Sequence, residues 1–260
     1  IDNPEYLHQI RVALRRMRSG LSLLQSTEQP IAISWDKSLR KIMQKLNEAR
    51  DWDVFEHEIL PDILKKMTSV SEHEPIQQAT LATIQDIAIK TRQRTQKKLH
   101  HIEFTVLILA IERHLMALSS HTEMTTKEHI QQWATKILED RWQVLHRCCQ
   151  GLTTQTGAKR HQARIAAKKM RYAADTLFSL FNRKNPQRFT EMLANLQDEL
   201  GYTNDRRVAL QLLQQVAQKK GSAAFDLGRF SGTLEIETLQ REHQSSDAWR
   251  SLSRMKLFWR

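Results

Sequence analysis

The chain has 260 residues, a formal net charge of +11 at pH 7 and 2 cysteines. No apolar run reaches the roughly 18 residues that a membrane-spanning helix needs, and the adjacent Cys148 and Cys149 cannot form a disulfide framework, so we expect a cytoplasmic protein with no membrane partner. The basic excess favours an anionic partner and does not by itself separate nucleic acid, an anionic membrane surface and a polyphosphate.

Low counts of glycine (7) and proline (5) predict an all-α chain. Asparagines precede Pro4 and Pro186 as N-caps, Thr125 stands at capping-box spacing before Glu128, and Gly201 predicts a helix break. Periodicity predicts helices over 4–26, 35–50, 52–69, 75–99, 103–119, 126–150, 158–182, 187–200, 204–220 and 223–255. We expect one domain of two lobes, about 1–122 and 123–260.

The first predicted helix carries a row of basic residues beside its apolar face. On a helical wheel of about 100° per residue, the row lies next to an arc that includes Leu7 and Leu14 rather than opposite it. A neighbouring helix should therefore shield these charges in part. The row consists of His8, Arg11, Arg15 and Arg18, with Arg16 at its side.

The same row recurs later in the chain with the same spacing. The second copy is His161, Arg164, Lys168, Lys169 and Arg171. A weaker repeat relates residues 46–51 to residues 200–205. Two repeats at nearly one offset predict one ancestral unit used twice, hence two similar lobes related by pseudo-twofold symmetry.

A row of like charges on one helix costs a few tenths of a kcal/mol per neighbouring pair, which an anionic ligand would recover. Four cations over three turns span about 15 Å, a length that suits several phosphates of a chain. Neither row contains a carboxylate to hold Mg²⁺, and no zinc-helix spacing occurs, so we expect binding without catalysis, metal or cofactor. A solvated charged face is the usual alternative for a single row, and the repetition counts against it.

At these residues the sequence resembles the CHAD family, the conserved histidine α-helical domain. Residues 8–18 and 161–172 are similar to its two signatures, residues 50–54 to its Arg-Asp-x-Asp-Val segment, and residues 196–205 to the later counterpart. The resemblance covers essentially the whole chain. It implies an all-α fold of two pseudo-symmetric four-helix-bundle-like lobes around a basic groove, and the groove holds inorganic polyphosphate. Because such proteins often carry an upstream CYTH-type domain, and the chain opens on Ile1, a preceding domain is expected.

The resemblance implies that both basic rows contact the ligand, together with Tyr172 of the second signature. Arg50 either forms a buried pair with Asp51 that positions the groove or belongs to a helix-end pair. Lys41 and Lys45 extend the groove wall or form a solvated face, and Arg206 and Arg207 add contacts or plain surface charge. Asp175 stands where the family often has glutamate, which shortens its reach.

The function predicted is non-catalytic binding of inorganic polyphosphate, with targeting to polyphosphate granules as one use of it. A nucleic-acid-binding helical module is the first alternative, less favoured because the sequence shows no recognition-helix motif and no exposed aromatic set. An accessory domain of a triphosphate- or polyphosphate-processing enzyme is the second.

Overall fold

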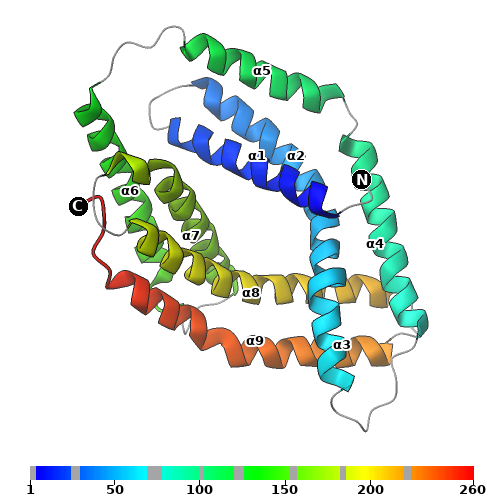
Figure 1. The fold of residues 1–260 in the computed structure, drawn as a ribbon. Coiled ribbons are helices and arrows are strands. Elements are labelled where there is room, and N and C mark those ends of the chain that lie inside the picture. Colours follow the sequence, from blue (N-terminus) through cyan, green and yellow to red (C-terminus); the bar gives the residue numbers. More distant parts are fainter. Residues whose placement is uncertain are drawn as a thin grey trace. The chain divides into compact units, whose positions relative to one another are not determined.

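The computed structural model describes residues 4–24, 30–68, 78–99, 102–119, 126–152, 157–181, 186–219 and 224–260. Within these ranges every regular element is a helix and no strand occurs (Figure 1). The all-α prediction is confirmed. The α-helices are α1 (Pro4–Leu24), α2 (Pro30–Val54), α3 (Leu60–Thr68), α4 (Gln78–Leu99), α5 (Ile102–Ser119), α6 (Lys127–Cys149), α7 (Gly157–Leu177), α8 (Pro186–Lys219) and α9 (Ala224–Ser253).

Two predicted breaks are absent. A π-helix, η2 (Phe55–Ile59), joins α2 to α3 without interruption, so no helix ends at residue 50. Gly201 lies inside α8, where it is buried and not in the left-handed conformation that ends a helix. Glycine lowers helix propensity by only about 1 kcal/mol, which packing of the surrounding residues outweighs.

One helix start and one helix end refine the sequence predictions. The N-cap of α6 is Thr126 and not Thr125, and its hydroxyl accepts from the backbone N–H of His129 at 3.4 Å. The predicted caps Asn3, Thr125 and Asn185 lie outside the described residues. At its C-terminal end α7 passes into a 3₁₀ turn, η4 (Phe178–Leu180).

The chain divides into two compact units, each made of three segments. Unit 1 comprises residues 1–12, 42–101 and 202–241, and unit 2 comprises residues 13–41, 102–201 and 242–260. Helices α1, α2, α8 and α9 each contribute residues to both units. This division differs from the single boundary expected near residue 122, and the equivalence of the two sequence repeats stays a prediction.

Unit 1 is built on a core of aromatic and branched side chains. Trp52 and Phe55, at the junction of α2 and η2, are fully buried with ring centroids 5.9 Å apart. The same core includes Ile84 of α4, Leu213 of α8 and Phe230 of α9. Burial of large apolar side chains at about 25 cal/mol per Å² stabilises this unit and fixes the faces of its helices.

Unit 2 has the larger core, in which α6 and α7 pack along each other (Figure 1). The inner face of α7 carries small buried residues, including Ala163 and Ala167. Met170, which follows on the same helix, is also buried. Leu23 of α1 and Trp259, beyond α9, belong to the same cluster. The core therefore holds the second half of α1 and the whole of α7 in one unit.

Candidate functional site

The first basic row follows α1 and is anchored to α2 at two points. In unit 1, Nη1 of Arg11 donates to the Leu46 carbonyl at 3.1 Å and to Oδ1 of Asn47 at 2.7 Å. In unit 2, Arg18 holds Asp36 with two hydrogen bonds, from Nε to Oδ1 at 2.7 Å and from Nη2 to Oδ2 at 3.2 Å. Part of the row's charge is therefore already engaged by α2, which the sequence did not predict.

The other members of this row differ in exposure. His8 and Arg15 are half-buried, whereas Arg16 is exposed. The apolar arc beside them points inward as predicted, with Leu7 and Leu14 buried. Partial shielding of His8 and Arg15 is the condition expected of cations that flank a packed helix face.

The second basic row lies wholly in unit 2, on α7. His161 and Lys169 are exposed, while Arg164 and Lys168 are half-buried. Nε of Arg164 lies against α8, because a Cβ placed on Gly201 would be 3.9 Å from it. The segment around Gly201, which the family resemblance singled out, thus contacts the second row at Arg164.

Asp175 of α7 lies within electrostatic reach of both rows. Its Oδ2 is 3.7 Å from Nε of Arg171, longer than a hydrogen bond, and its side chain is 47% exposed. Partial burial raises the pKa of Asp175, while the charges of Arg171 and then of Arg16 lower it. A cation of α1 and a cation of α7 therefore act on one carboxylate within unit 2.

Arg50 is a candidate outside the two basic rows. The sequence analysis placed it in a buried pair with Asp51 or in a helix-end pair, and the structure shows a different partner. Its Nη2 donates to Oε1 of Glu58 in η2 at 3.1 Å, and α2 continues past it to Val54. The helix-end interpretation is therefore wrong. Lys41 and Lys45 are exposed and Tyr172 is half-buried.

Arg206 takes part in a network of charges in unit 1. Its side chain is 12% exposed, with Nε 3.4 Å from Oε2 of Glu237 and Nη2 3.5 Å from Oδ2 of Asp62. Its guanidinium also lies 3.4 Å from the ring centroid of Tyr202, whose hydroxyl donates to Glu237 at 2.9 Å. This engagement favours a packing role for Arg206, while Arg207 beside it is exposed.

The sequence analysis did not identify Arg92, which holds two carboxylates in unit 1. Nε of Arg92 donates to Oδ1 of Asp53 at 2.6 Å, and its Nη2 also binds Glu56. Burial opposes the charge of Arg92, but these two carboxylates outweigh it and raise its pKa. Asp53, in the segment that resembles the family motif, therefore helps to hold α4 against α2 and η2. The position of Arg92 in its helix gives no signal in the sequence that Asp53 is its partner.

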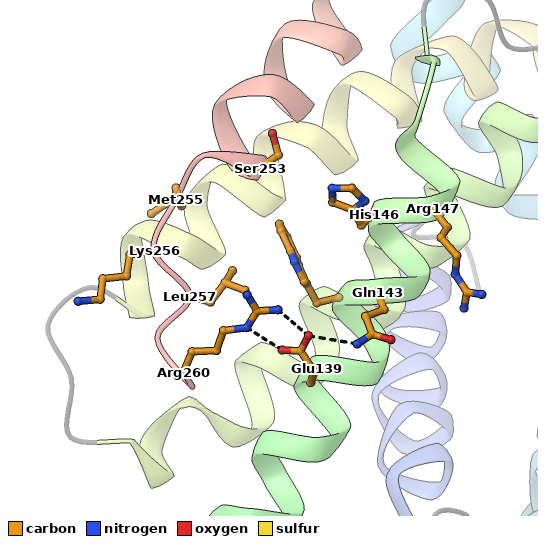
Figure 2. Close-up of a pocket in the computed structure, with 10 residues that line it drawn as sticks. Glu139, Gln143, His146, Arg147, Ser253, Met255, Lys256, Leu257 and Arg260 are labelled. Carbon is orange, nitrogen blue, oxygen red and sulfur yellow. Dashed lines mark hydrogen bonds and ion pairs between the residues drawn. The ribbon is translucent and has the colours of Figure 1, made fainter.

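A cavity of about 710 Å³ lies in unit 2 between α6 and the residues that follow α9. Figure 2 shows Arg260 and Glu139 bound to each other there, with Lys256 and Arg147 extending away on opposite sides. None of the predicted binding residues lines this cavity. It is therefore a separate feature from the two basic rows.

In the part of the chain that the structure describes, no three His, Cys, Asp or Glu side chains are grouped so that they could hold a metal ion. Among the described helices, none combines the length and the apolar character needed to cross a bilayer. The predicted absence of a metal and of a cofactor stays a prediction.

Comparison with known proteins gives a family and a fold. Residues 1–214 match the family model described as "CHAD domain". The crystal structure of the CHAD domain from the plant Ricinus communis is similar, with a TM-score of 0.78 and 26% sequence identity over 98% of this chain and 83% of that chain. None of the curated proteins compared with the chain matches it.

Proposed function

The chain belongs to the CHAD domain family, and from this premise we propose that it binds linear inorganic polyphosphate without catalysis. The proposed ligand contacts are basic residues of the two rows other than Arg11 and Arg18, which hydrogen-bond to α2. In unit 2 these are Arg15 and Arg16 of α1 and His161, Arg164, Lys168, Lys169 and Arg171 of α7. Use of this site for targeting to polyphosphate granules belongs to the same proposal.

One observation carries the proposal. Arg16 and Arg171 come from different rows and both act on the charge of Asp175. Arg16 and Arg171 together carry more positive charge than the single carboxylate of Asp175 can neutralise. A polyanion with one charge per phosphate would neutralise the excess, whereas a single small anion would reach only one or two of the cations.

The chemistry of each side chain suits a phosphate chain. The guanidinium groups of Arg15, Arg16 and Arg164 can each present two parallel N–H donors to phosphate oxygens. Lys168 and Lys169 supply point charges, and His161 supplies a ring N–H. Each charge-assisted hydrogen bond contributes about 1.5–3 kcal/mol before the ordering of side chain and ligand is subtracted.

The test is calorimetric titration with long-chain polyphosphate and with orthophosphate at matched ionic strength. We expect tight binding of the long chain only, with an affinity that falls steeply as salt rises, because counterions are released. Lys169→Ala should weaken binding several-fold and flatten the salt dependence. Lys159→Ala, an exposed lysine of α7 outside the row, is the matched control and should leave both unchanged. Equal affinity for orthophosphate and the long chain would refute the proposal.

A competition experiment and an activity assay test the two alternative functions, nucleic-acid binding and catalysis. If duplex DNA or RNA displaces polyphosphate at moderate salt and binds more tightly, the protein is a nucleic-acid-binding module. If the purified protein releases orthophosphate from polyphosphate with Mg²⁺ or Mn²⁺, and one carboxylate substitution abolishes the release, it takes part in catalysis. We expect neither outcome.

A further inference from the structure

Arg141 lies within the apolar face of α6 that packs into the core of unit 2. On a helical wheel of about 100° per residue, four residues within about 60° of it are buried and apolar. They are Ala134, Ile137, Leu138 and Leu145. Burial of a charge is unfavourable unless a partner compensates it, so a cation at this position needs an explanation.

The hydrogen-bond partner of Arg141 carries no charge. Nη2 of Arg141 donates to Oγ of Ser22 in α1 at 3.0 Å, and the Ser22 hydroxyl donates its own proton to the Ser19 carbonyl at 2.8 Å. Within the described ranges, no carboxylate forms an ion pair with Arg141. Burial lowers the pKa of Arg141, and the charge of the neighbouring Asp140 does not offset this effect. The charge of Arg141 is therefore poorly compensated in the protein alone.

Ser22 stands at the next position of the first basic row. The members of that row are three or four residues apart, and Ser22 follows Arg18 by four, within the same arc of roughly 80°. Where the row would continue, α1 has a hydroxyl, and α6 places the guanidinium of Arg141 on that hydroxyl. Arg18, Ser22 and Arg141 all belong to unit 2. A cation from a second helix thus occupies the end of the row.

We infer that Arg141 is a further contact for the polyphosphate chain and continues the first basic row with a cation from α6, a helix that carries neither row. The inference rests on the proposed function. A phosphate chain that passes Arg15 would reach the level of Ser22 after about 10 Å along α1, at 1.5 Å per residue. An anion at that point compensates the charge that Ser22 cannot, which explains why an arginine stands in the apolar face of α6.

The geometry of the guanidinium allows this contact alongside the bond to Ser22. Arginine has several N–H donors in one plane, and Ser22 accepts from Nη2 of Arg141. The Arg141 side chain is half-buried, so part of it is open to a ligand. Phosphate oxygens can therefore accept from the other donors while the bond to Ser22 keeps the guanidinium in place.

The test is titration with long-chain polyphosphate at several salt concentrations. Arg141→Gln keeps a donor for Ser22 and removes the charge, so it should weaken binding about five-fold and reduce the slope of log affinity against log salt by roughly 0.7–1. Arg141→Lys keeps the charge and should restore the slope. Arg147→Gln is the matched control, because Arg147 is exposed on α6 about 120° away around the helix, and it should change neither quantity.

The stability of the protein without ligand distinguishes binding from a structural role. Arg141→Met places an apolar side chain of similar length among the buried residues of α6. Its melting temperature should equal or exceed that of the unmodified protein, because burial opposes the charge of Arg141. If Arg141 served only to join α6 to α1, Arg141→Met would lower the melting temperature and Arg141→Gln would leave the salt slope unchanged. That result would overturn the inference.

Lys169→Ala separates a failure of this inference from a failure of the proposed function. We expect both Lys169→Ala and Arg141→Gln to weaken binding of the long chain. If Lys169→Ala weakens it and Arg141→Gln binds as the unmodified protein does, the inference is wrong and the proposed function stands. If the unmodified protein binds long polyphosphate no more tightly than orthophosphate, both are wrong.

Discussion

Arg92 of α4 binds Asp53 of α2, with 2.6 Å between Nε and Oδ1, and the carboxylate is only 1% exposed. A buried carboxylate of this kind depends on its partner, because the loss of one member leaves an uncompensated charge. We therefore expect Arg92→Ala to lower the free energy of unfolding by about 3 kcal/mol, measured by urea denaturation.

Lys90→Ala is the control for this substitution. Lys90 lies on the same helix and pairs with Asp86 at 2.7 Å, but its side chain is 59% exposed. Exposed pairs contribute about 0–1 kcal/mol, so this variant should unfold nearly as the unmodified protein does. Similar losses in both variants would show that the burial of Asp53 has no special consequence.

Gly201 offers a test of the continuous helix α8. Alanine at this position would place its methyl group 3.9 Å from Nε of Arg164, an ordinary contact, and would improve helix propensity. Gly201→Ala should therefore raise the free energy of unfolding by about 0.5–1 kcal/mol. Gly151, with a φ of 67°, is the contrasting position, where alanine should destabilise by about 1 kcal/mol. Destabilisation at Gly201 would indicate a helix end there, as the sequence suggested.

Arg16 and Arg18 should separate ligand binding from stability. Arg18 is held by two hydrogen bonds to Asp36, and both side chains are about one-quarter exposed (27% and 25%). Arg18→Ala should therefore cost about 1 kcal/mol of stability. Arg16→Ala should leave the melting temperature unchanged and weaken polyphosphate binding several-fold. Calorimetric titration and thermal unfolding of both variants check this, and a stability loss confined to Arg16→Ala would reverse the assignment.

The pair of Glu139 and Arg260 predicts a dependence of stability on acid. Hydrogen bonds from Arg260, at 2.6 Å and 2.9 Å, lower the pKa of Glu139 from 4.5 to about 2, and Trp259 and Gln143 add smaller effects that together outweigh burial. The folded state thus favours the charged carboxylate. The stability it contributes is complete above pH 4.5 and is lost as pH falls from 4.5 toward 2.

Glu139→Gln should remove this contribution. Urea unfolding of the variant between pH 2 and pH 7 should show a shallower loss of stability below pH 4.5 than in the unmodified protein. Glu191→Gln, an exposed glutamate of α8, is the control and should keep the original slope. An unchanged slope in Glu139→Gln would mean that other carboxylates govern the acid response.

The helices of the fold were predictable because periodicity and capping are local signals. The first basic row and its apolar neighbours Leu7 and Leu14 could be assigned to adjoining faces from spacing alone. The long-range partners could not be predicted in this way. Asp36 binds Arg18, and Asn47 binds Arg11, across separations that no spacing rule connects.

The same limit explains the errors. Gly201 and residue 50 were taken as helix ends from local propensity, which tertiary packing overrides. The pairing of Arg92 with Asp53 could not be predicted from the sequence, because it depends on how α4 packs in unit 1. Candidate ligand residues could be listed from the sequence, whereas the hydrogen bonds that hold Arg11 and Arg18 to α2 could be found only in the structure.

The interleaved composition of the two units has a consequence for synthesis on the ribosome. Unit 1 requires residues 202–241, and unit 2 requires residues 242–260, where Trp259 enters its core. Unit 1 cannot be completed until residue 241 has left the ribosomal exit tunnel, and unit 2 cannot be completed until residue 260 has left it. A premature stop codon between residues 242 and 260 would therefore leave unit 2 without part of its interior, and one before residue 241 would leave both units incomplete.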